Sequence, residues 1–422
     1  MSGRPVGRPQ VARKGRPRRD APTGIRQQRT TREGGLRSFV KMDLRISPSD
    51  KTTNVRLGVA EAHSFLKFVA SIFAEKSFKP HPLFAGGHAQ TLAAYAWPRR
   101  YRFESPRDEE RLFEIEREVK VLAHCRWQQL PSEHSTVVLW HGIEGSTASI
   151  YMIAMAHKAF RAGFNVVRVN FRNCGGTEHL TSTLYHGGMS SDLRAVINEL
   201  IKTDGLKRIF PIGFSLGGNL VLKLAGEYGE NAPREVVAVC AVSPSVDLRA
   251  STDLILLRKN WIYHQDFMRR LKKRIRIKKK LFPGLYDLSK LSLVHSIRDF
   301  DEHFTATAHG FTNADDYYYR SSSVRVVGKI CIPTLIVHAQ DDPFIPFTPL
   351  RDPGLAANPY ILLMETKRGG HVAFISAKKV GEDRFWAENR AIEFCLLAER
   401  ALASWYPISE SASTDAGHGY GQ

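Results

Sequence analysis

Cysteine is scarce in this sequence, and the positions of the cysteines argue against both a metal site and a disulfide framework. Neither a C-x-x-C pair nor a histidine cluster with metal-ligand spacing is present, so the sequence predicts no metal site. The odd number and the scattered positions argue against a disulfide framework and predict reduced core residues in a cytosol-like compartment. The five cysteines are Cys125, Cys174, Cys240, Cys331 and Cys395.

Long apolar runs are also missing. No run reaches the roughly 20 residues that span a bilayer, and the N-terminus lacks the apolar core of a secretory signal. Hydrophobic residues make up 43% and charged residues 24%, as in ordinary globular proteins. At 422 residues the chain can hold one α/β domain of roughly 250 to 300 residues with appendages. These features predict a cytoplasmic protein.

Acidic residues are nearly absent from two stretches, which together account for the net charge of +19. Residues 1–41 contain twelve Lys or Arg and only Asp20 and Glu33, and residues 269–280 contain nine Lys or Arg and no acid. The rest of the chain is near neutral. The basicity therefore belongs to a tail and one patch, and not to the body of the protein.

The N-terminal stretch is rich in Arg, Pro and Gly and poor in large apolar residues. This composition predicts a disordered basic tail over residues 1–45. A solvated extension, or a true start at Met42, is the favoured explanation, and a nucleic-acid-binding tail is the alternative. We therefore expect no nucleic-acid partner.

Short apolar segments alternate with amphipathic helices over residues 55–406. After an early antiparallel pair within 111–129, this order predicts an α/β domain with a mostly parallel, doubly wound sheet. Residues 247–327 interrupt the alternation and predict a helical cap insertion, and residues 407–422 predict a frayed tail. Strands are expected at 135–140, 164–171, 208–212, 236–242, 333–338 and 360–365, and helices at 55–76, 149–162, 190–202, 219–228 and 384–405.

The stretch Gly213-Phe214-Ser215-Leu216-Gly217 has the G-x-S-x-G pattern of a nucleophile elbow. The pattern alone is a weak signal, but an apolar strand precedes it and a helical pattern follows it. A serine at positive φ brings the residues two before and two after it together, so glycine is needed at both places. The sequence therefore predicts Ser215 as a nucleophile at the end of a strand.

A serine nucleophile needs a base and an acid that orients the base. In the order Ser, Asp, His, the chain offers Asp342 after one expected strand and His371 after the next, at the sheet edge where ligands bind. Asp342 is preferred over Asp341 because it precedes a proline in the loop after the penultimate strand. Asp247 is the second alternative for the acid.

An oxyanion hole requires two backbone N–H groups near the serine. One is expected from Leu216, at the start of the helix after the elbow. The other is expected from Ile143, with Glu144 as the alternative, because both follow the buried strand that ends before His141. His141 is expected to hold this loop and not to transfer protons.

Several segments together resemble the YheT-type branch of the α/β hydrolases, which includes plant embryogenesis-associated proteins and yeast medium-chain ethyl-ester enzymes. The resemblance covers about residues 75–400. It implies an α/β-hydrolase fold, a triad of Ser215, Asp342 and His371, no cofactor, and activity on medium-chain acyl esters. His88 is expected to make a structural hydrogen bond, with a role in the site as the alternative. The matching segments are Gly87-His88-Ala89-Gln90-Thr91, His141-Gly142-Ile143-Glu144-Gly145, Arg172-Asn173-Cys174-Gly175-Gly176, 213–218, 297–301, 317–319 with Ser322, 341–343 and 370–371.

The predicted function is that of a serine hydrolase that cleaves short- or medium-chain acyl or lipid esters through an acyl-enzyme. An acyltransferase that uses an alcohol acceptor is one alternative. A non-catalytic binding protein of the same fold is another, although an intact triad argues against it. No oligomeric state is predicted.

Residues 261–282 place apolar side chains at helical spacing, with cations largely on the other face. The favoured explanation is the solvated face of a cap helix. Weak peripheral binding to an anionic membrane is the alternative, since each Lys or Arg near such a surface contributes about 1 kcal/mol.

Overall fold

The computed structural model describes residues 57–97, 99 and 108–405. The predicted tails at 1–45 and 407–422 lie outside these residues. Among the described residues, no helix is both long enough and apolar enough to cross a membrane.

An eight-stranded sheet with the order β1-β2-β4-β3-β5-β6-β7-β8 forms the centre of the described residues. β2 pairs antiparallel with β1 and with β4, and the remaining neighbours pair in parallel. The predicted α/β class with a mostly parallel sheet is therefore confirmed. The strands are β1 (Glu109–Glu116), β2 (Val119–Arg126), β3 (Thr136–Trp140), β4 (Asn165–Val169), β5 (Ile209–Phe214), β6 (Val239–Val242), β7 (Thr334–Ala339) and β8 (Ile361–Thr366).

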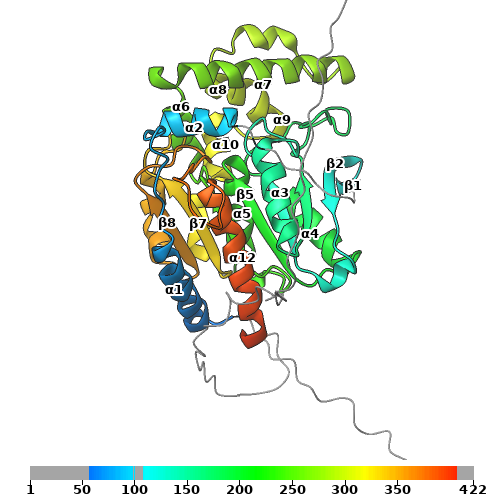
Figure 1. Ribbon diagram of the computed structural model, residues 1–422. Coiled ribbons are helices and arrows are strands. Elements are labelled where there is room, and N and C mark those ends of the chain that lie inside the picture. Colours follow the sequence, from blue (N-terminus) through cyan, green and yellow to red (C-terminus); the bar gives the residue numbers. More distant parts are fainter. Residues whose placement is uncertain (1–56, 98, 100–107, 406–422) are drawn as a thin grey trace, which may run out of the picture. The chain divides into compact units, whose positions relative to one another are not determined.

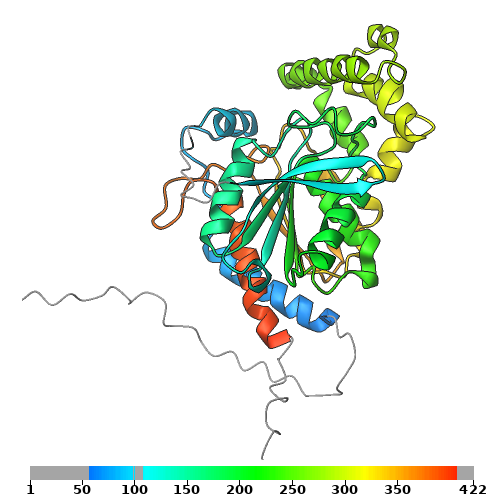
Figure 2. The same cartoon turned by 90° about the vertical axis from the view of Figure 1, so that its right-hand side faces the viewer.

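Helices cover both faces of the sheet, which Figure 2 shows close to edge-on. Along β3, Val137 and Leu139 join one apolar core, whereas Val138 and Trp140 join the other, because successive side chains of a strand point to opposite faces. Helices α1 (Val59–Glu75), α3 (Ile150–Arg161) and α12 (Trp386–Trp405) contribute mainly to the first core, and α4 (Ser190–Lys202) and α5 (Leu216–Tyr228) to the second. Burial on both faces explains why β3 to β7 are mainly apolar, with buried polar exceptions that include Asn165 and Arg168 on β4 and His338 on β7.

The chain between β6 and β7 leaves the sheet, and we refer to residues 247–327 as the cap. Its helices gather with α2 (Gly87–Ala96) at one end of the sheet (Figure 1). They pack around a third apolar cluster that includes Met268, Leu271 and Phe300. The cap helices are α6 (Leu248–Ile255), α7 (Trp261–Leu281), α8 (Ile297–Phe300), the π-helix η5 (Asp301–Ala306), α9 (Thr307–His309) and α10 (Ala314–Ser321), and α11 (Pro353–Ala356) lies between β7 and β8.

Candidate active site

Ser215 occupies a sharp turn between β5 and α5. Its φ is 53°, in the left-handed region that residues with side chains seldom adopt. A Cβ on Gly213 would lie 2.1 Å from the carbonyl oxygen of Gly217, and a Cβ on Gly217 would lie 2.4 Å from that of Trp140. Both positions exclude a side chain, as the glycine spacing indicates. The Ser215 amide donates to the Val242 carbonyl at 2.9 Å, which fixes the turn against β6.

His371 and Asp342 are in direct contact. Nδ1 of His371 lies 2.8 Å from Oδ2 of Asp342, and Oδ1 of Asp342 accepts from the amides of Phe344 and Ile345 at 2.8 and 3.0 Å. Burial alone would raise the pKa of Asp342, but the His371 ring and the amide donors outweigh burial and lower it. The carboxylate therefore stays ionised and holds one ring nitrogen, which leaves Nε2 free to serve another group.

The two alternative acids contact other groups. Oδ1 of Asp341 accepts from the Gly370 amide at 2.9 Å and so holds the loop that carries His371. Asp247 caps helix α6, where its Oδ1 accepts from the Ala250 amide at 3.0 Å. Of the three candidate carboxylates, only Asp342 is bonded to the imidazole in the described residues.

Helix α2 supports the His371 loop, which the sequence analysis did not foresee. Thr91 Oγ1 accepts from the His371 amide at 2.9 Å and donates to the Gly87 carbonyl at 2.7 Å. The Gln90 side chain exchanges two hydrogen bonds with the Ile375 backbone, at 2.7 and 3.1 Å. These contacts give the Gly-His-x-Gln-Thr segment a physical role. The sequence shows this segment as a recognisable motif. It does not show what the motif contacts, because the partners lie about 280 residues away in sequence.

The amides of the loop after β3 differ in whether they already have an acceptor. The Gly142 amide donates to the Tyr151 hydroxyl at 2.9 Å, and the Glu144 amide donates to the Tyr185 hydroxyl at 3.0 Å. The Glu144 amide is therefore already used, which leaves Ile143 as the candidate donor from this loop.

Ile143 and Leu216 both lie on the wall of the cavity that contains Ser215. Leu216 is the first residue of α5, so its amide has no acceptor within the helix. A Cβ on Gly142 would lie 3.1 Å from Cβ of Ser215, which means that the loop passes directly beside the serine. The two amides expected for an oxyanion hole thus come from two elements that meet at Ser215.

His141 is buried and anchors the same loop. Its Nε2 accepts from the Phe171 amide at 3.1 Å, and its Nδ1 lies 2.7 Å from the Gly142 carbonyl oxygen. Burial lowers the pKa of His141 to about 4, so the ring is neutral. This arrangement agrees with the prediction that His141 holds the loop.

Two cations of the basic patch, residues 269–280, are buried. The sequence pattern had predicted that these cations lie largely on the solvent face. Arg274 on α7 forms an ion pair with Glu144, with Nη2 and Oε2 2.9 Å apart. Nζ of Lys278 donates to the carbonyl oxygens of Thr181 and Glu178. Burial and the nearby Arg274 guanidinium lower the pKa of Lys278 to about 8. Both side chains therefore tie the cap to the loops at the end of the sheet.

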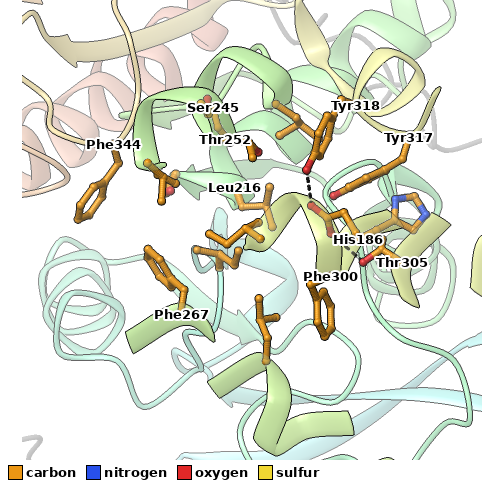
Figure 3. A pocket seen from close by; sticks show the side chains of 18 of the residues that line it. His186, Leu216, Ser245, Thr252, Phe267, Phe300, Thr305, Tyr317, Tyr318 and Phe344 are labelled. Carbon is orange, nitrogen blue, oxygen red and sulfur yellow. Dashed lines mark hydrogen bonds between the residues drawn. The ribbon is translucent and has the colours of Figure 1, made fainter. Parts of the chain in front are cut away.

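Ser215 and His371 line a cavity of about 850 Å³, solvent-open space included, together with residues of the cap. Figure 3 shows three of these cap residues, Phe267, Phe300 and Tyr318, around the cavity. Among the described residues, the side chains of Ser215 and His371 are not hydrogen-bonded to each other. Such a bond can still form in the complex with substrate, because catalytic hydrogen bonds often tighten only when substrate is bound. Most of the remaining wall is apolar. The large apolar side chains are Ile143, Leu184, Leu216, Leu248, Ile255, Phe267, Leu271, Ile297, Phe300, Phe344 and Ile345.

His88 lies outside this cavity. Its Nδ1 is 3.2 Å from the Tyr263 hydroxyl, and the two rings stack, which connects α2 to α7. This contact agrees with the structural role expected for His88. Within the described residues, no group of three or more His, Cys, Asp or Glu side chains could hold a metal ion.

Comparison with known proteins extends these observations. The family model described as "alpha/beta hydrolase fold" matches residues 135–378. The protein YheT of Escherichia coli, named as an esterase, is 31% identical over 269 residues, which cover 63% of this chain and 78% of YheT. Phospholipase ABHD3 of mouse is 28% identical over 245 residues, which cover 58% of this chain and 59% of the phospholipase. The match thus spans less than two thirds of the mouse protein.

Among solved structures, the esterase Pf2001 of Pyrococcus furiosus is similar, with a TM-score of 0.46 and 18% identity. The superposition covers 72% of this chain and 98% of that esterase.

Proposed function

This chain belongs to the α/β-hydrolase family as an ester hydrolase of the YheT branch, and on that premise we propose that Ser215, His371 and Asp342 form its catalytic triad. The observation that supports the triad best is the 2.8 Å contact of His371 with Asp342 at a cavity that Ser215 also lines. The strained turn at Ser215 adds support, because strain of this kind recurs at active sites.

The mechanism that follows has two halves. His371 takes the proton of Ser215 while Asp342 holds the imidazole, and Oγ of Ser215 attacks the ester carbonyl. The amides of Ile143 and Leu216 stabilise the oxyanion. His371 then gives its proton to the departing alcohol. In the second half, His371 activates a water molecule, which releases the acid from the acyl-enzyme and restores Ser215.

The substrates we propose are esters of short- or medium-chain acids, including lipid esters. The mainly apolar wall of the cavity supports this class, since each CH₂ group that leaves water contributes roughly 0.8 kcal/mol. A panel of esters of increasing acyl length should show kcat/KM rising with length until the cavity is filled and falling beyond it.

Ser215→Ala tests the nucleophile. We expect a loss in kcat on the order of 10⁶, because removal of the serine of a triad abolishes the acyl-enzyme. Ser245→Ala is a matched control on the same cavity wall, and its loss should stay below about tenfold. Melting curves of both variants should resemble that of the wild type. Near wild-type turnover by Ser215→Ala would remove Ser215 from the mechanism.

An alcohol could release the acyl group in place of water, which would make the protein an acyltransferase with the same triad. Product analysis with and without ethanol separates the two reactions, since only transfer yields an ethyl ester. A protein of this fold that only binds esters would produce neither the acid nor the ethyl ester.

The outer face of α7 supports a further part of the proposal, weak peripheral contact with an anionic membrane surface. Lys273, Arg276 and Lys280 are exposed on this helix. Trp261 and Ile262, at its start, are 62% and 72% exposed, and exposed apolar side chains of this kind can insert at the boundary of a bilayer. Cations beside exposed apolar side chains suit a surface of anionic lipid.

Co-sedimentation with vesicles of anionic lipid tests this contact. A variant with Lys273, Arg276 and Lys280 replaced by Gln should bind more weakly, and binding by the wild type should fall as salt is added. The control is a variant with three exposed lysines outside the cap replaced by Gln: Lys202, Lys207 and Lys329. Equal binding by the two variants, or no binding by the wild type, would leave α7 as ordinary solvated surface.

A further inference from the structure

The cavity wall carries a carboxyl group for which the proposed mechanism has no use. Asp301, the first residue of the π-helix η5, lines the same cavity as Ser215. Its Oδ1 accepts from Oγ1 of Thr305 at 2.8 Å, and its Oδ2 accepts from the Tyr318 hydroxyl at 2.7 Å. Figure 3 shows Thr305 and Tyr318 on one side of the cavity with Tyr317, across from Phe344. This side of a mainly apolar cavity thus carries a cluster of polar groups.

No cation neutralises this carboxyl group. Among the described residues, none forms an ion pair with Asp301, although Arg274 lies elsewhere on the cavity wall. Burial raises the pKa of Asp301 to about 7, and the two hydroxyl donors offset only part of that effect. Asp301 is half-buried, and a carboxylate withdrawn from water without a cation is costly for a fold. An amide at this position would keep hydrogen bonds to both hydroxyls without that cost, so the fold alone does not call for a carboxyl.

The backbone at Asp301 is also unusual. Residues 301–306 form a π-helix between α8 and α9. This helical form is rare, and its short segments recur at functional sites. The backbone therefore points to a role for η5 in the site, independently of the contacts of Asp301.

We propose that Asp301 accepts a hydrogen bond from a free hydroxyl group of the substrate, so that the preferred substrates are esters whose acyl or alcohol part carries a hydroxyl. This proposal rests on the proposed ester hydrolysis at Ser215. A carboxylate has about four lone-pair positions, and Thr305 and Tyr318 occupy two of them. The remaining positions are available to a molecule in the cavity.

A hydroxyl fits this site better than an ammonium group. Near neutral pH the carboxyl is partly protonated, and a hydroxyl can pair with either form because it both donates and accepts. An ammonium group only donates, and it would pair with the ionised form alone. The groups that already contact Asp301 are neutral hydroxyls as well.

Matched ester pairs test the proposal. On the acyl side, methyl octanoate is compared with methyl hydroxyoctanoates whose hydroxyl is moved along the chain. On the alcohol side, ethyl octanoate is compared with 2-hydroxyethyl octanoate. We expect at least one hydroxylated ester to be preferred in kcat/KM by about tenfold to a hundredfold, the range of a hydrogen bond to a charged group. The side on which the preference appears tells which part of the substrate reaches Asp301.

Asp301→Leu and Asp301→Asn are then measured with the same pairs, with melting curves as a check on folding. Asp301→Leu should remove the preference, and Asp301→Asn should reduce it at least several-fold. Asp253→Asn is the matched control, because Asp253 is a cap residue with an exposed carboxyl outside the cavity. It should keep the wild-type preference. If Asp301→Leu does not fold, the isosteric Asp301→Asn decides.

Two results would overturn the proposal. One is a wild-type protein that prefers none of the hydroxylated esters or prefers a cationic ester more strongly. The other is a preference that survives in both Asp301 variants, which would leave Asp301 as a link between η5 and α10. Failure of the underlying function has a different signature, since the wild type would then hydrolyse none of the esters or Ser215→Ala would retain activity.

Discussion

The end of the sheet and the cap form opposite walls of one cavity, but they hold their polar groups in different ways. At the sheet, backbone geometry fixes the groups: the strained turn at Ser215 and the amides that bind Asp342. In the cap, side chains fix one another, as Arg274 does with Glu144 and Tyr318 with Asp301. Backbone geometry and amides thus hold the serine turn and Asp342, whereas the polar groups of the cap are held by contacts between side chains.

Among the variants that keep Ser215, the largest expected effect on kcat tests the groups at the end of the sheet. Asp342→Asn should lower kcat by a factor on the order of 10⁴, because the amide no longer holds the imidazole in the right tautomer. Asp341→Asn is the adjacent control. It should lower kcat far less, because the amide oxygen that replaces the carboxylate can still accept from the Gly370 amide. Steady-state kinetics on one ester measures both. Greater sensitivity at Asp341 would mean that the acid has been misassigned.

The next effect tests how the cap is attached. Arg274→Met leaves the carboxylate of Glu144 buried without its cation, since the two side chains are 9% and 5% exposed. We expect a loss of about 3–5 kcal/mol in the free energy of unfolding. Arg276→Met removes an exposed cation from the same helix and should change stability by less than about 0.5 kcal/mol. Urea unfolding measures both, and equal losses would contradict a role for the Glu144 pair.

The last effect, a change in melting temperature that depends on pH, distinguishes a site residue of the cap from a structural one. The folded state raises the pKa of Asp301 to about 7, so the unfolded chain releases this proton at a lower pH than the folded protein does. Ionisation of Asp301 therefore lowers the free energy of unfolding, and this loss grows as pH rises from about 4 to about 7. Asp301→Asn should melt higher than the wild type at pH 8, with a smaller difference at pH 5. A variant that melts lower at pH 8 would show that the carboxyl stabilises the fold.

Much of the sheet, and of the groups at its end that line the cavity, could be predicted from the sequence. The elbow glycines, the strand before Ser215 and the order of Asp342 and His371 are local patterns, and each follows from the backbone geometry of one turn or one strand end. The predicted strands agree with the observed ones apart from shifts at their ends, as in β6, which begins at Val239 and not at 236.

The cap was less accessible to sequence analysis. Its helical character followed from apolar spacing, but the burial of Arg274 and Lys278 did not, because the partners of these side chains lie about 100 or more residues away. The same holds for Thr91, whose contact with the His371 loop joins distant parts of the chain. A single sequence records such residues without indicating what they touch.

Covalent labelling tests the central claim most directly. A fluorophosphonate probe should react with the active protein, and mass spectrometry of the peptides should find a single adduct on Ser215. Labelling should fall in step with ester hydrolysis when a competing ester is added, and it should disappear in Ser215→Ala. An adduct on a different serine, or full hydrolytic activity after Ser215 has been completely labelled, would contradict the proposed mechanism.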